Sequence, residues 1–68
     1  MSANPSRWLH SDSAPKDGTI YLGKWSRPGK KIDLVTQGHF DVGFDRHMPI
    51  SDDERFIDAR LRTWRPRP

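Results

Sequence analysis

The apolar and polar positions of the chain first form a regular pattern at residues 19–25, "TIYLGKW". β-Branched and aromatic residues are frequent in this stretch, and they alternate between two faces, as in a β-strand. One face would carry Ile20 and Leu22, and the other Tyr21 and Trp25. Because both faces are partly apolar, the pattern predicts a central strand over Thr19–Trp25.

A second alternating stretch, Lys31–Phe40, follows the turn sequence "RPGK". Pro28 and Gly29 occupy the two central positions at which a type II turn prefers these residues. The two stretches are therefore expected to pair as antiparallel strands. Gly38 could mark a bulge or a bend in the second one.

A turn is also expected just before the first strand, in "APKDGT". Pro15 presets the backbone, Asp17 can accept hydrogen bonds from neighbouring amides, and Gly18 tolerates a positive φ. The alternative is a ligand-binding loop. A phosphate-binding P-loop, however, needs more glycine and a helix after its lysine, whereas here a strand follows.

The last third of the chain predicts one short helix and a third strand. Ser51 is a suitable N-cap, and Glu54 would complete a capping box. An apolar stripe then continues through Phe56 and Ile57 to Leu61. The alternation in "ARLRTW" predicts a strand over Leu61–Trp64, provided that the helix ends near Ala59.

These elements predict an α+β or mainly β domain, with a small three-stranded antiparallel sheet and one short helix packed on it. A chain of 68 residues has room for one domain, expected at residues 8–66, with flexible tails at 1–7 and 67–68. The absence of cysteine excludes a disulfide framework and a cysteine-ligated zinc site. The expected core is Trp8, Ile20, Leu22, Trp25, Ile32, Leu34, Phe40, Phe56, Leu61 and Trp64.

Charge is unevenly distributed along the chain, although the net charge is only +3. Basic residues gather near the predicted hairpin turn and at the C-terminus, while acidic residues collect between them. Arginine pairs well with phosphate, and tryptophan can stack on a base. The alternative is a solvated strand edge with Trp64 in the core. The candidate binding residues are Lys30, Lys31, Arg60, Arg62, Arg65 and Arg67.

Metal binding has only weak candidates, His39, Asp41 and His47, which lie close to Asp45 in the sequence. Imidazole and carboxylate ligands suit zinc or manganese. No helix is predicted there to place two ligands on one face, so surface or turn positions explain these residues equally well. No catalytic residue and no cofactor is assigned.

A resemblance to a known group rests on Trp8, the stretch "SAPKDGT", the apolar strand after it, and "TWRPRP" near the end. This order of features resembles short phage and prophage proteins and is similar to the domain-of-unknown-function family DUF551. The chain departs from that pattern at Arg65, where the group usually has methionine, and residues 38–58 have no counterpart. The resemblance implies a phage or mobile-element accessory protein, and it assigns no catalytic residue.

The expected function is a non-catalytic binding protein that modulates a host protein. The alternative is a nucleic-acid-binding accessory domain that uses the basic C-terminal segment. A small metal-dependent enzyme is a weaker alternative. No segment approaches the roughly 20 apolar residues of a membrane span, so we expect a cytoplasmic protein without a membrane partner. The sequence does not predict the oligomeric state.

Overall fold

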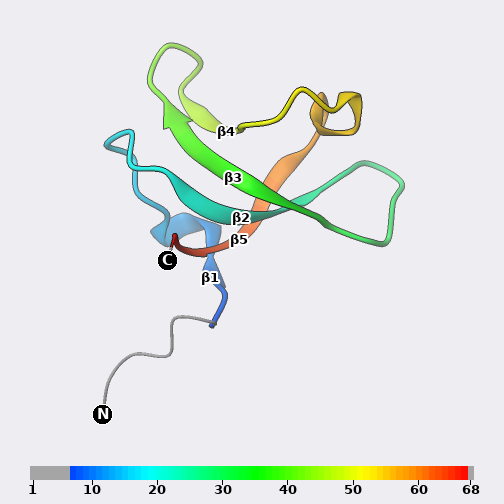
Figure 1. Cartoon of the computed structure of the whole chain (residues 1–68), viewed down its shortest axis with the longest axis horizontal. Helices are drawn as coiled ribbons and strands as arrows, with labels where there is room; N and C mark the ends of the chain where they lie inside the picture. The colour runs from blue at the N-terminus through cyan, green and yellow to red at the C-terminus, as the bar shows by residue number, and fades with distance from the viewer. Residues whose placement is uncertain (1–6, 68) are drawn as a thin grey trace.

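A computed structural model describes residues 7–67 and contains, within this range, one five-stranded antiparallel sheet in the order β1-β5-β2-β3-β4 (Figure 1). The strands are β1 (Leu9–His10), β2 (Tyr21–Ser26), β3 (Leu34–Asp41), β4 (Arg46–Pro49) and β5 (Arg60–Pro66). Two 3-10 turns, η1 (Ser11–Ser13) and η2 (Glu54–Phe56), complete the elements. The predicted tails at 1–7 and 67–68 fall largely outside the described residues.

The central position of β2 is confirmed, because β2 pairs with both β3 and β5. The hairpin turn before β3 is also confirmed: the amide of Lys30 donates to the carbonyl of Arg27 at 3.2 Å, and Gly29 has a φ of +71°. The prediction of a mainly β fold with an antiparallel sheet is also confirmed. The expected number of three strands was wrong, because β1 and β4 are too short to show a pattern in the sequence.

The "APKDGT" stretch forms the expected turn. The amide and the hydroxyl of Thr19 both donate to one carboxylate oxygen of Asp17, at 2.9 and 2.5 Å, and Gly18 has a φ of +90°. These two hydrogen bonds stabilise the carboxylate and lower the pKa of Asp17. Turn geometry therefore accounts for Asp17 and Gly18.

The core forms on the aromatic face of β2. Tyr21 and Trp25 are fully buried there. The predicted core drew on both faces of this strand and was wrong for Ile20 and Ile32, which are 38% and 75% exposed. Leu22 faces away from the aromatic pair. The buried residues are Ala14, Tyr21, Trp25, Phe56 and Trp64, with Leu34, Ala59 and Leu61 packed against them.

Two glycines explain why the aromatic face is buried. A side chain on Gly23 would meet Leu61 at 2.7 Å, and a side chain on Gly38 would collide with the indole of Trp25. The ring of Trp25 uses this space, and its Nε1 donates to the carbonyl of Thr36 at 3.1 Å. The indole is thus buried with its polar atom satisfied.

The predicted helix was wrong. Asp53, and not Ser51, caps the segment, since its carboxylate accepts from the amide of Arg55 at 2.9 Å. Only the short turn η2 forms, and it buries Phe56 while Ile57 remains exposed. β5 begins at Arg60, so Leu61 belongs to a strand that pairs with β2. No helix among the described residues has the length and apolar character to cross a membrane.

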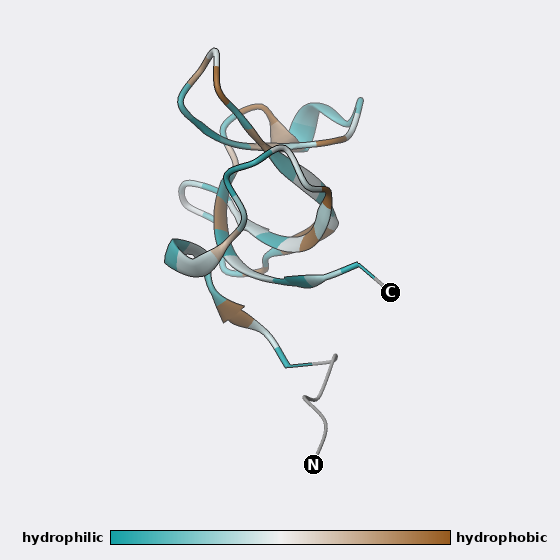
Figure 2. Ribbon diagram, turned by 90° about the vertical axis from the view of Figure 1, so that its left-hand side faces the viewer, coloured by the Kyte–Doolittle hydropathy of each residue, from teal (hydrophilic) through white to brown (hydrophobic). Residues whose placement is uncertain are grey.

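The sheet is strongly curved. Viewed from the side, its strands curl around the core (Figure 2). The curvature brings β4, one edge of the sheet, into contact with β5, which is not its neighbour in the strand order. This approach places residues from the two ends of the chain around one cleft.

Candidate functional site

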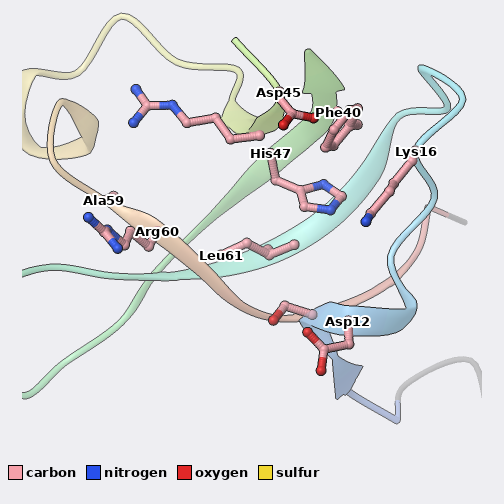
Figure 3. A pocket seen from close by; sticks show the side chains of 10 residues that line it. Asp12, Lys16, Phe40, Asp45, His47, Ala59, Arg60 and Leu61 are labelled. Carbon is pink, nitrogen blue, oxygen red and sulfur yellow. The ribbon is translucent and has the colours of Figure 1, made fainter. Parts of the chain in front are cut away.

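A cleft of about 590 Å³ opens where β4 and β5 approach η1. Its walls come from four parts of the chain: η1, the "APKDGT" turn, the β3–β4 hairpin and the start of β5. Figure 3 shows the side chains that line it. The lining includes Asp12, Lys16, Phe40, Asp45, His47 and Leu61.

The most constrained polar group of the cleft is His47. Its Nδ1 lies 2.7 Å from the hydroxyl of Tyr21, and its ring packs edge-on against both Tyr21 and Phe40. Burial, together with the positive charge of Lys16, lowers the pKa of His47 below its ordinary value of 6.5. His47 is therefore neutral at pH 7.

Burial raises the pKa of Tyr21, so its phenol also stays protonated at neutral pH. A neutral phenol donates one hydrogen bond, and His47 Nδ1 is its partner. This bond places the remaining imidazole proton on Nε2, which is buried and has no partner among the described residues. The cleft thus holds a hydrogen-bond donor without an acceptor.

Lys16 brings a positive charge to the same place. Its Nζ lies 5.8 Å from the centre of the Phe40 ring, a cation–π contact. Figure 3 shows the side chain extending from the turn toward His47. Lys16, Tyr21 and Phe40 lie in different elements and meet only through the curvature of the sheet, so no local sequence pattern marks them as site residues.

A second surface lies on the outer face of β1, β2 and β5. Trp8 was expected in the core, but it is half-buried on this face, with Lys24 Nζ at 4.6 Å and the Arg65 guanidinium carbon at 4.8 Å from the centre of its ring. Strand register places Arg65 opposite Leu22 and Arg60 opposite Ser26. We call Trp8, Lys24, Arg60 and Arg65 the basic face.

The other candidate cations have different surroundings. Lys30 and Lys31 are exposed in the β2–β3 loop, and Arg67 is exposed after β5. Arg62 is the extra residue at a bulge in the pairing of β2 with β5, and it lies 3.7 Å from the carboxylate of Asp33. Of the six candidates, Arg60 and Arg65 are placed on the basic face.

The weak metal candidates are divided between the two faces of the sheet. His47 contacts Phe40 on the inner face, whereas His39 and Asp41 flank Phe40 on β3 and face outward. Asp41 accepts a hydrogen bond from the amide of Phe44 at 3.1 Å, within the β3–β4 turn. Between residues 7 and 67, no three histidine or acidic side chains are grouped as metal ligands.

No protein-family model, curated protein or solved structure matches this chain. The resemblance to DUF551 therefore remains a proposal.

Proposed function

We propose that this chain is a small non-catalytic binding protein that holds single-stranded nucleic acid on its basic face. One observation carries the proposal: β1, β2 and β5 contain no acidic residue and four cations, Lys24, Arg60, Arg62 and Arg65. Acidic residues are concentrated instead at residues 51–58, around η2. A phosphate backbone would therefore be attracted to the basic face and repelled from the surface around η2.

Trp8 supports a single strand as the partner. Its ring is half-buried on the outer face and lies beside Lys24 and Arg65. Proteins that bind single strands commonly combine a cationic surface with aromatic rings on which bases stack. In this arrangement Lys24 and Arg65 would contact phosphates on either side of a base stacked on Trp8.

Fluorescence anisotropy with a labelled single-stranded oligonucleotide at low salt tests this function. We expect saturable binding that is weakened strongly by Lys24→Gln and by Trp8→Ala. The matched control is Arg55→Gln, which also removes one positive charge but lies in η2 beside Asp53. The proposal fails if the oligonucleotide does not bind, or if Arg55→Gln weakens binding as much as Lys24→Gln does.

A host protein is the second candidate partner. Val42 and Phe44, in the β3–β4 turn, are 79% and 68% exposed, and such apolar side chains favour a protein contact. The resemblance to phage and prophage proteins supports the same partner and a place in the cytoplasm of the host. A tagged chain should then retain one host protein that Phe44→Ser releases. Equal retention by both forms would argue against this partner.

A further inference from the structure

The cleft between η1, β4 and β5 holds Lys16 and His47 close together, and Arg46 and Arg60 also line it. Lys16 has no carboxylate within ion-pair distance among the described residues. His47 Nε2 lies buried without a hydrogen-bond partner. In Figure 3 the Lys16 side chain extends toward the His47 ring.

The hydrogen bond with Tyr21 determines which nitrogen of His47 carries the proton. If Nδ1 carried the proton, the buried hydroxyl of Tyr21 would lose its acceptor, and Nε2 would also lack a donor. If Tyr21 donates to Nδ1, only the Nε2 proton is left unpaired. The second arrangement leaves fewer buried groups unsatisfied, so the cleft offers an N–H donor from His47 and an ammonium from Lys16.

The remaining walls suit a small organic molecule better than a bare ion. Phe40 and Leu61 supply apolar surface, while Asp12 and Asp45 supply carboxylate acceptors at the edges (Figure 3). A volume of about 590 Å³ lies within the range typical of small-ligand sites. A ligand that fits would carry an anionic group for the two donors and hydroxyl groups for the carboxylates.

We propose that this cleft binds a small phosphate monoester, whose phosphate oxygens accept hydrogen bonds from Lys16 and His47. The hydroxyl groups of the ester donate to Asp12 and Asp45, and its carbon skeleton lies against Phe40 and Leu61. The phosphate also neutralises the charge of Lys16. Arg60 lines this cleft and also belongs to the basic face, whereas Trp8, Lys24 and Arg65 do not line the cleft.

Amide chemical shifts of the full chain, titrated with adenosine 5′-monophosphate and with ribose 5-phosphate, test the proposal. We expect saturable shifts at Lys16, Phe40, His47 and Leu61 with at least one ester. Adenosine and ribose, which lack the phosphate, should produce none. Lys16→Gln should weaken binding about tenfold, the loss expected for one charge-assisted contact.

Lys31→Gln is the matched control, because Lys31 is exposed in the β2–β3 loop and does not line the cleft. It should leave ester binding unchanged, as should Lys24→Gln, whatever its effect on nucleic acid. The proposal is overturned if neither ester produces saturable shifts, if the neutral compounds bind as well, or if Lys16→Gln binds as tightly as the unchanged chain.

Discussion

The indole of Trp25 occupies the space that a side chain at position 38 would need. A Cβ on Gly38 would collide with the six-membered ring of Trp25 and would lie 3.0 Å from the carbonyl oxygen of Met48. Trp25 is fully buried, and Gly38 belongs to the neighbouring strand, β3. The absence of a side chain at position 38 therefore leaves the space in which the indole of Trp25 is fully buried.

Gly38→Ala should lower the free energy of unfolding by about 1–3 kcal/mol, the usual cost of overpacking a core. The added methyl group meets the buried Trp25 ring on one side and backbone on the other, so neither neighbour can move easily. Urea unfolding followed by circular dichroism measures the change. Gln37→Ala, at the exposed neighbouring position, is the control and should change stability little. Equal stabilities of the two variants would contradict this account of the core.

The same pair of residues shows why the sequence predicted the strands but placed residues from both faces of β2 in the core. Alternation places Ile20 and Leu22 on one face of β2 and Tyr21 and Trp25 on the other. It does not indicate which face is buried. The deciding feature is room for the indole of Trp25, which Gly38 on the neighbouring strand β3 provides. The local pattern predicts the hairpin but does not show that Gly38 lies beside the indole of Trp25.

The prediction of a helix in the last third of the chain was wrong for a related reason. Residues 51–54 do contain a capping residue, but it caps only the short turn η2. The carboxylate of Asp53 accepts hydrogen bonds from the amide and the side chain of Arg55. From Arg60 onward the chain pairs with β2, the central strand, so residues 57–59 only connect η2 to β5. Tertiary pairing therefore overrode a local preference that is worth little in a short segment.

Ser13→Ala should destabilise the chain by about 1 kcal/mol, because it removes the acceptor of a core tryptophan. Nε1 of Trp64 donates to the Ser13 hydroxyl at 3.0 Å, and that hydroxyl donates to the carbonyl of His10 at 2.8 Å. The serine thus joins η1 to β5. Ser26→Ala serves as the control, because its hydroxyl makes only a 3.4 Å contact at an exposed site. Unfolding midpoints in urea would show whether the two variants differ as expected.

The candidate sites were predictable only in part. From residue type alone, the sequence indicated Arg60 and Arg65 as binding residues and His47 as a weak metal candidate. The sequence did not predict that Trp8 lies on the outer face rather than in the core, or that Lys16 of the "APKDGT" turn lies near His47. Both placements depend on the pairing of β1 with β5 and on the curvature that brings β4 to β5.

The free energy of unfolding should decrease as the pH is lowered below about 6.5, because of His47. Its pKa is lowered in the folded chain, so the unfolded chain takes up a proton first as the pH falls. The unfolded state then binds more protons, and the free energy of unfolding decreases until the folded histidine is protonated as well. Above about pH 6.5 the contribution of the neutral imidazole is complete. Melting temperatures between about pH 8 and about pH 5.5 measure the effect.

His47→Gln should reduce this pH dependence while keeping an acceptor for the hydroxyl of Tyr21. His39→Gln is the control, because His39 lies on the outward face of β3, away from Tyr21. We expect the first variant, and not the second, to flatten the melting temperature over this range. If the slope of His47→Gln equals that of the unchanged chain, the cleft histidine does not govern the pH response.

Oligonucleotide binding should depend steeply on salt, and the steepness should report which cations contact phosphate. For single strands, each neutralised phosphate contributes about 0.7 to the slope of the logarithm of affinity against the logarithm of salt concentration. Lys24→Gln should therefore reduce the magnitude of the slope by about 0.7. Trp8→Ala should weaken binding but leave the slope unchanged, because stacking releases no counterions. Anisotropy titrations at several salt concentrations separate the two effects. An unchanged slope for Lys24→Gln would show that its ammonium stabilises Trp8 without contacting phosphate.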